Sequence, residues 1–490
     1  MKTWQNLDEL TLSSHYATLP ESWYHAIEPT PLPDPAIVSV NHMVAEQLHI
    51  NPCSLDPHQL AAWLGGHTLP PGARPLAMKY SGHQFGVYNP QLGDGRGLLL
   101  GELEIDGERW DLHLKGAGQT RYSRMGDGRA VLRSSLREYL VGEALTHLGI
   151  PSTRALAVCV SSQKIQRERV ELAATILRVS RCHIRFGHFE HLYYTRQFDG
   201  LKQLADYCLD RYYPDCQSAD NPYLAMFQHI SQRSADMVAG WQAYGFLHGV
   251  MNTDNMSILG ETFDHGPFAF IDRWKENAVY NHTDQEGRYA FDQQPDVIHW
   301  NLSALAQALT PLVPVDDLKA ALEQFPERYA AAYQQRMSLR LGLATSQPGD
   351  DELIRHWRDL LNQHQADYNP LYRALSEAQQ SDDGQPGLNH LDLASWQTML
   401  NDWLPQYQQR LQQETCNAET RRHAMLAVNP AYTLRTHVAQ HLIDRAEEGD
   451  YQPLNDWLTI LQHPFDEHPG FEQWRRAPDT RGLVMLSCSS

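Results

Sequence analysis

The sequence lacks several features that mark common protein classes. No stretch approaches the roughly 18 unbroken apolar residues of a membrane-spanning helix, and residues 1–10 lack the basic-then-apolar order of a secretory signal. We find no repeat of solenoid period. These absences predict a cytoplasmic protein that does not engage a membrane.

Cysteine is scarce and scattered. The seven cysteines are an odd number and include no Cys-x-x-Cys pair, which excludes a disulfide framework and a zinc site. Cys488, in the closing Ser487-Cys488-Ser489-Ser490, is a tail thiol that oxidants could reach. An ordinary tail thiol without a role is the equal alternative.

Positive charge is also in short supply. A net charge of −19 argues against general nucleic-acid binding, which needs a basic face. The balance reverses between Arg96 and Arg185, where 15 Lys and Arg face 10 Asp and Glu. This local excess predicts a small anionic ligand, and a solvated basic face is the alternative.

What is present is ordinary globular composition. With 490 residues, 42% hydrophobic and 20% charged, the chain is long enough for two or three packed units. Period-two alternation in 98–105 and 110–115, around Asp106-Gly107, predicts a hairpin with Lys115 at a strand end. Apolar residues at helical spacing predict a helix over 132–148, which Gly149-Ile150-Pro151 ends. Further strands are expected at 155–160 and 173–179.

Beyond about residue 200 the pattern becomes helical. It includes Met237 to His248 and the segment after Pro430, whereas Gln379 to Gly387 has the chemistry of an exposed loop. The sequence therefore predicts an α+β, protein-kinase-like fold of two lobes. We expect a mixed lobe over 1–190 and a larger helical lobe over 191–490, with a cleft between them.

Two copies of Gly-Asp-Gly-Arg, Gly93 to Arg96 and Gly126 to Arg129, flank the strand that carries Lys115. Glycine lets backbone N–H groups approach an anion, and arginine offers a planar fork to phosphate. One copy would be weak evidence because Asp-Gly is a common hairpin turn. Two copies favour phosphate binding.

Lys115 and Glu138 have the placement of the lysine and glutamate that kinases pair against nucleotide phosphates. Glu143 is the competing partner. A surface ion pair of little energetic worth would be the ordinary interpretation of such a pair alone.

The segment His248 to Asn255 is the most informative. In kinase-like phosphotransferases an Asp two residues after the His acts as base, and an Asn five places later binds metal. Here Val250 occupies the position of the base, and valine cannot accept a proton. Asp254 is the carboxylate best placed to replace it, although it could instead cap a helix or loop.

Asp264, followed by His265-Gly266, resembles the Asp-Phe-Gly metal motif, and Asp272 is the second candidate. We prefer Asp264 because of the following glycine. Arg178, Arg181 and Arg185 have no acidic neighbours over 176–189, which favours a phosphate clamp over a solvated loop.

Several long strings resemble the selenoprotein O family over nearly the whole chain. They are Gly82 to Gly86, Gln91 to Arg96, Leu114 to Thr120, His248 to Asn255 and Ser487 to Ser490. The resemblance implies a pseudokinase that binds ATP in a reversed orientation and transfers AMP to Ser, Thr or Tyr of proteins, releasing pyrophosphate. Transfer of UMP with manganese is a further implied activity.

The resemblance also implies roles for individual residues. Lys115 would contact phosphates and Glu138 would orient it, Asp254 would be the base, and Asn255 and Asp264 would hold Mg²⁺ or Mn²⁺. The nucleotide site would be lined by Gly93, Gly95, Arg96, Asp127, Gly128, Arg178 and Arg185, the last two gripping the γ-phosphate. With that phosphate drawn away, the α-phosphate faces the acceptor, which accounts for Val250.

Two other functions stay open at this point. One is conventional phosphorylation with Asp254 as a displaced base, and the other is a catalytically silent nucleotide-binding module.

The resemblance also bears on Cys488. Some bacterial members of the family carry a second cysteine that could pair with the tail cysteine, but Tyr280 stands at that position here. This argues against a redox disulfide of Cys488.

Overall fold

The computed structural model describes residues 3–380, 401 and 403–478. Cys488 and most of the expected loop 379–387 lie outside the described residues. Among the helices that are described, none is both long and apolar enough to cross a membrane.

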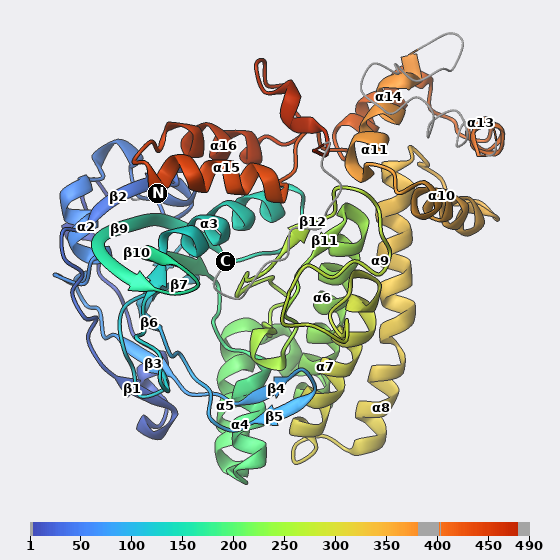
Figure 1. The fold of residues 1–490 in the computed structure, drawn as a ribbon. Coiled ribbons are helices and arrows are strands. Elements are labelled where there is room, and N and C mark those ends of the chain that lie inside the picture. Colours follow the sequence, from blue (N-terminus) through green and yellow to red (C-terminus); the bar gives the residue numbers. More distant parts are fainter. Residues whose placement is uncertain (1–2, 381–400, 402, 479–490) are drawn as a thin grey trace.

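The N-terminal part is built on one antiparallel sheet (Figure 1). Its strands run in the order β1-β3-β6-β7-β10-β9-β2, with β8 paired to β10. The bounds are β1 Tyr24–Ala26, β2 Ala36–Val40, β3 Leu76–Met78, β6 Gly97–Ile105, β7 Glu108–Lys115, β8 Ala130–Val131, β9 Arg154–Gln166 and β10 Val170–Ser180.

The expected hairpin is confirmed as β6 and β7. Asp106 and Gly107 both have positive φ, 51° and 82°, as a two-residue turn of the primed type requires. The strands expected at 155–160 and 173–179 lie within β9 and β10, and each of these strands extends beyond the expected residues at both of its ends. The sheet separates a larger and a smaller hydrophobic core. Leu112 and Leu114 of the hairpin pack in the smaller core. His113 and Lys115 alternate with them and therefore point to the opposite face of the sheet.

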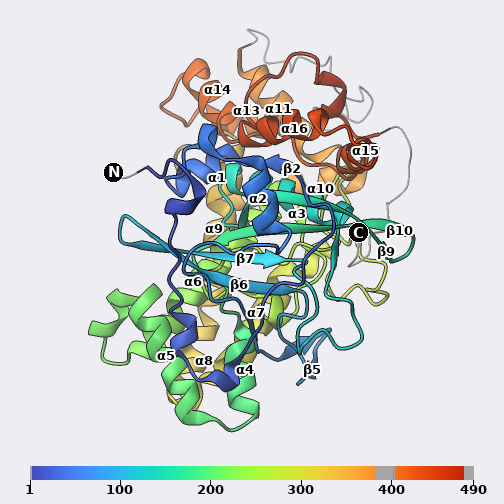
Figure 2. The same cartoon turned by 90° about the vertical axis from the view of Figure 1, so that its left-hand side faces the viewer.

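The expected helix over 132–148 is confirmed as α3, Leu132–His147, which packs on β9 and β10. Helical spacing predicts one apolar face, yet nearly every α3 residue is buried. The reason is that α15 (Thr436–Glu447) and α16 (Gln452–Gln462) return from the end of the chain and cover it, as both views show (Figure 2). Residues 436–462 thus pack with the sheet-containing part of the chain.

Helices dominate the remainder, as expected, and α15 confirms the helical segment after Pro430. The helix expected over Met237 to His248 is corrected: α6 ends at Tyr244, because Gly245 (φ 71°) terminates it and β11 pairs with β12. The other bounds are α1 His42–Gln47, α2 Pro57–Leu64, α4 Phe186–Tyr194, α5 Phe198–Tyr212, α6 Pro222–Tyr244, β11 Phe246–Leu247, β12 Ala269–Phe270, α7 Gln294–Leu309, α8 Val315–Glu323, α9 Phe325–Arg340, α10 Asp350–His364, α11 Tyr368–Glu377, α13 Leu404–Leu411 and α14 Ala418–Leu426.

Candidate active site

The sheet register places two cations on one face. Lys115 of β7 lies opposite Ile176 of β10, and Arg178 lies opposite His113. Alternation along the strands sends Leu114 and Leu177 to the other face. Lys115 and Arg178 are therefore diagonal neighbours on the face that looks towards α3.

Glu138 of α3 meets both cations. One carboxylate oxygen accepts from Lys115 Nζ and the other from Arg178 Nε. Burial alone would raise the pKa of Glu138, but Arg178 and Lys115 outweigh it and hold that pKa well below its usual range. Burial also lowers the pKa of Lys115, to about 8, despite the partial compensation by Glu138.

Glu143, the competing partner, faces elsewhere. Its two oxygens accept from Arg154 at 2.7 Å each, and Gln462 of α16 adds a third bond at 3.0 Å. The structure therefore pairs Lys115 with Glu138 and uses Glu143 to tie α3 to β9 and α16.

Asp264 is held by two arginines. Arg178 Nη2 donates to its Oδ1 at 2.6 Å, and Arg185 Nη1 donates to its Oδ2. Burial would raise the pKa of Asp264, but Arg185, Arg178 and Lys115 outweigh it and keep that pKa well below its usual range. The backbone of Asp264 is left-handed (φ 55°), a conformation that non-glycine residues rarely adopt outside constrained sites.

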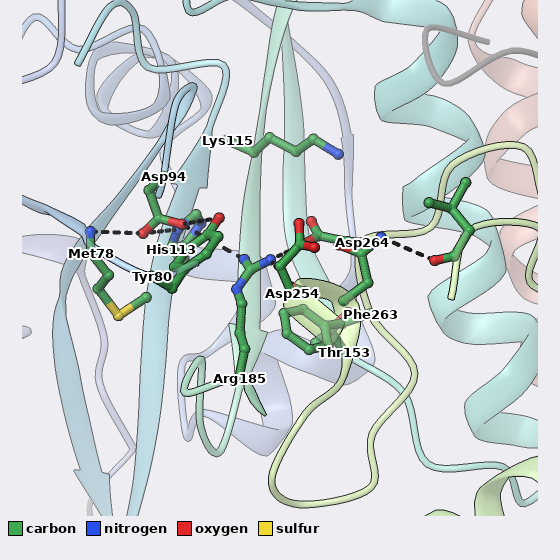
Figure 3. A network of polar contacts seen from close by, with 12 residues as sticks. Met78, Tyr80, Asp94, His113, Lys115, Thr153, Arg185, Asp254, Phe263 and Asp264 are labelled. Atoms are coloured by element: carbon green, nitrogen blue, oxygen red, sulfur yellow. Dashed lines mark hydrogen bonds and ion pairs between the residues drawn. The ribbon is translucent and has the colours of Figure 1, made fainter. Parts of the chain in front are cut away.

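Arg185, at the start of α4, links this carboxylate to the first glycine loop (Figure 3). Its Nη1 also donates to the carbonyl of Asp254 at 2.8 Å, and Nη2 lies 3.7 Å from Asp94 Oδ1. Asp94 in turn accepts from the Met78 N–H at 3.0 Å and the Tyr80 hydroxyl at 3.2 Å. The guanidinium is thereby fixed from two sides.

The segment His248 to Asn255 contributes another part of the cavity wall. Asp254 and Asn255 lie in a 3-10 turn, Thr253–Asn255, and Asn255 Nδ2 donates to the Val250 carbonyl at 3.0 Å. Asp254 Oδ2 accepts from Gln84 Nε2 at 3.2 Å, while its Oδ1 is buried without a hydrogen-bond partner among the described residues. Burial raises the pKa of Asp254 to about 7. Asp254 is thus a carboxylate aimed at the cavity, and it does not cap a helix.

Gly93 and Gly128 pack too closely against neighbouring groups to carry a side chain. A Cβ at Gly93 would lie 2.5 Å from the Tyr122 ring, and one at Gly128 would lie 2.1 Å from the backbone of Gly118. Asp127 Oδ1 accepts the Arg129 N–H at 2.9 Å, and both its oxygens accept from Arg167 at 2.7 and 2.8 Å. Asp127 therefore shapes the second loop from within.

Three residues of the motifs have other uses. The Arg129 guanidinium lies at the cavity wall, but its terminal nitrogens donate to the carbonyls of Thr30, Pro31 and Gly116. Arg181 pairs with Glu108 at 2.6 Å, outside the cavity, which corrects the expected three-arginine clamp. Asp272 is bound by Arg435 at 2.6 Å, away from the loop that carries Asn255.

These elements enclose a cavity of about 610 Å³. Seven Lys and Arg but only four Asp line it, which suits a polyanion such as a triphosphate. All the expected site residues reach it except Glu138, which stands behind Lys115; those that line it are Gly93, Gly95, Arg96, Lys115, Asp127, Gly128, Arg178, Arg185, Asp254, Asn255 and Asp264.

Sequence reasoning missed Asp94, His113 and Gln84. Asp94 stands inside a motif that was noted for its glycines and arginine, and His113 lies two residues before Lys115, so alternation places it on the same face. Gln84 lies in a separate hairpin, and no local pattern connects it with Asp254.

Asn255 and Asp264 suit a divalent metal by their chemistry. Carboxylate and amide oxygens are hard ligands, and Mg²⁺ commonly takes one or two protein carboxylates together with substrate phosphates. The described residues contain no cluster of three or more His, Cys, Asp or Glu that could hold a metal by itself. The donor set therefore fits a metal that arrives with a nucleotide.

The fold and the cavity define an enzyme of the kinase-like nucleotide-binding class, in which a Lys–Glu pair, a metal-type aspartate and glycine loops surround one pocket. Comparison with known sequences gives the family: residues 6–462 match the protein adenylyltransferase SelO family. The chain belongs to that family.

Close relatives agree over the whole length. The chain is 49% identical to the protein nucleotidyltransferase YdiU of Hahella chejuensis, with 99% of each chain covered. It is 48% identical to that of Pseudomonas aeruginosa, with 99% and 100% covered, and 48% identical to that of Vibrio parahaemolyticus, with 100% of both covered. The chain is accordingly a nucleotidyltransferase that uses a nucleotide substrate.

Proposed function

We propose that this enzyme transfers AMP from ATP to Ser, Thr or Tyr hydroxyls of other proteins and releases pyrophosphate. The observation that carries the proposal is the pair Val250 and Asp254 on one cavity wall. The position of a kinase base is apolar, while a buried carboxylate with a free oxygen lies at the same wall.

In this reaction Asp254 and three cations would have separate roles. Asp254 would take the proton of the acceptor hydroxyl while that oxygen forms a bond to the α-phosphorus of ATP. The bond from the α-phosphorus to the bridging oxygen breaks, and the pyrophosphate that leaves carries the electron pair. Lys115, Arg178 and Arg185 supply positive charge for that developing negative charge.

Mg²⁺ or Mn²⁺ held by Asn255 and Asp264 would neutralise phosphate charge and align the triphosphate. The arginines would then exchange part of their contact with Asp264 for the γ-phosphate in the reversed orientation. UTP would fit the same scheme, with transfer of UMP, because the contacts to the phosphates do not involve the nucleobase.

The position of the radioactive label tests the proposal. Protein incubated with ATP labelled at the α-phosphate should retain label, and protein incubated with γ-labelled ATP should not. The opposite result would indicate ordinary phosphorylation. No label from either, with D264A identical to wild type, would indicate a silent binding module.

A further inference from the structure

The hairpin of β4 (Gly82–Gln84) and β5 (Val87–Asn89) stands apart from the main sheet, beside α4 (Figure 1). It is bound to the segment His248 to Asn255 and to Tyr289. The His83 N–H donates to Thr253 Oγ1 at 2.7 Å, and the Phe85 N–H donates to the Tyr289 hydroxyl at 2.9 Å. A Cβ at Gly82 would lie 2.9 Å from Thr253 Oγ1, so the contact is close.

The two faces of this hairpin differ. His83 and Tyr88 share the back face, where the His83 ring packs against Trp300 at 5.3 Å and the Tyr88 ring packs against Tyr194 at 4.1 Å. These aromatic contacts support the hairpin on α7 and α4. The hairpin is therefore a fixed part of the site wall.

Gln84, Val87 and Asn89 share the front face, since cross-strand partners point the same way. Gln84 donates to Asp254 and accepts from Asn89 Nδ2 at 3.2 Å, so this face adjoins the carboxylate. Val87 is 72% exposed. An apolar side chain is therefore largely uncovered by the described residues, on the same face as Gln84, which contacts the expected base.

The outer edge of β5 is also open. Because the His83 N–H points away from β5 to Thr253, His83 and Tyr88 form a non-hydrogen-bonded pair. The N–H and C=O of Tyr88 must then also point outwards. None of the hydrogen bonds among the described residues uses these two groups.

We propose that the acceptor protein docks here, as an extended segment that pairs with the edge of β5 and covers Val87 with an apolar side chain. This inference rests on the proposed function, because it supplies the protein substrate of that reaction. Main-chain pairing gives affinity without strict sequence demands, and one apolar contact adds selectivity. The segment's hydroxyl would lie beside Gln84 and reach Asp254.

Dephosphorylated β-casein, an extended protein rich in hydroxyls, serves as the acceptor probe with α-labelled ATP. V87D should lower kcat/KM for casein about tenfold, as expected for one lost apolar contact and a buried charge. The affinity for ATP should stay unchanged. V87I, which keeps a β-branched apolar side chain, and V170D, at another exposed valine (59% exposed) at the start of β10, should behave as wild type.

A synthetic casein segment with single N-methylated amides tests the strand pairing. Methylation should raise KM at alternate positions, because only every second amide faces the partner strand. Equal kcat/KM for V87D and wild type, or KM without that alternation, would overturn the inference. The inference would also be overturned if the wild-type enzyme labelled bacterial lysate proteins but not casein. If it labelled neither, the proposed function itself would be overturned.

Discussion

Asp264 and Asp272 are close in sequence but have different partners. Asp264 joins Arg178 and Arg185 at the cavity, whereas Asp272 shares Arg435 with Asp367. The first pairing lies where a triphosphate would compete for the arginines. The second fastens the start of α15 to the loop after β12.

D264N should reduce transfer of α-label at least a hundredfold, because it removes the carboxylate expected to hold the metal. D272N is the matched control and should keep most of the transfer rate, although it leaves the buried Arg435 with one partner fewer. Initial rates at saturating ATP measure both. A D264N rate within tenfold of wild type would contradict the assignment.

Glu138 contacts Lys115 and Arg178 together, so its charge orders at once the two cations that we propose bind phosphate. E138Q should weaken binding of a fluorescent ATP analogue about tenfold, since one lost charge-assisted contact is worth about 1.5 kcal/mol or more. E143Q removes a similar buried glutamate outside the cavity and should leave that affinity unchanged. Equal affinities for the two variants would refute the role of Glu138.

At the scale of elements, two loops owe their shape to glycines that lie against other backbone. Gly128 (φ 71°) lies against Gly118, so any Cβ there forces the loops apart. Gly126 belongs to the same motif but has ordinary φ, and its Cβ would approach only the Ser123 carbonyl, at 3.1 Å. Neighbouring glycines thus have unequal importance.

G128A should lower ATP affinity tenfold or more and lower the melting temperature by several degrees, because the residue is strained and the loops move apart. G126A should change both quantities little. Isothermal titration with ATP and a thermal melt report the two effects. Similar losses in both variants would mean that loop flexibility, and not close packing, is what glycine supplies.

The sequence predicted the elements whose signals are local. The β6–β7 hairpin follows from alternation around Asp106-Gly107, and α3 follows from its apolar spacing. The end of α6 was misplaced, because Phe246 and Leu247 continue an apolar pattern and only pairing with β12 makes them a strand. The role of Gln84 and the ion pairs of Asp272 and Glu143 depend on contacts between distant segments, which no local pattern encodes.

At the scale of the whole molecule, β2 and α16, which are far apart in the sequence, meet at α3. Ser39 of β2 donates to Asn455 of α16 at 2.7 Å and lies 3.0 Å from the Tyr139 hydroxyl of α3. Glu143 adds its bond to Gln462. Contacts across more than 300 residues therefore hold the helix that carries Glu138.

The stability of this junction should depend on pH through Glu143. Burial would raise the pKa of Glu143, but Arg154 outweighs it and the pKa falls to about 2, below its unfolded value. The ionised carboxylate thus stabilises the fold above about pH 4.5, and this contribution is lost as the pH falls towards 2.

E143Q should therefore lower the unfolding free energy by about 2–4 kcal/mol at pH 7, and by much less near pH 3. Urea unfolding at the two pH values measures the difference. E104Q, at an exposed pair with Arg109, should cost under about 1 kcal/mol at either pH. A deficit of E143Q that does not change with pH would contradict the linkage.

The cover that α15 and α16 place over α3 has a consequence for biosynthesis. During translation the strands and the lysine emerge long before residues 436–462 leave the ribosome. Until then α3 lacks the cover of α15 and α16, and the glutamate that pairs with the lysine lies on a helix with an uncovered face. We therefore expect a product that stops before residue 436 to be inactive and open to proteolysis, because α3 is then left uncovered.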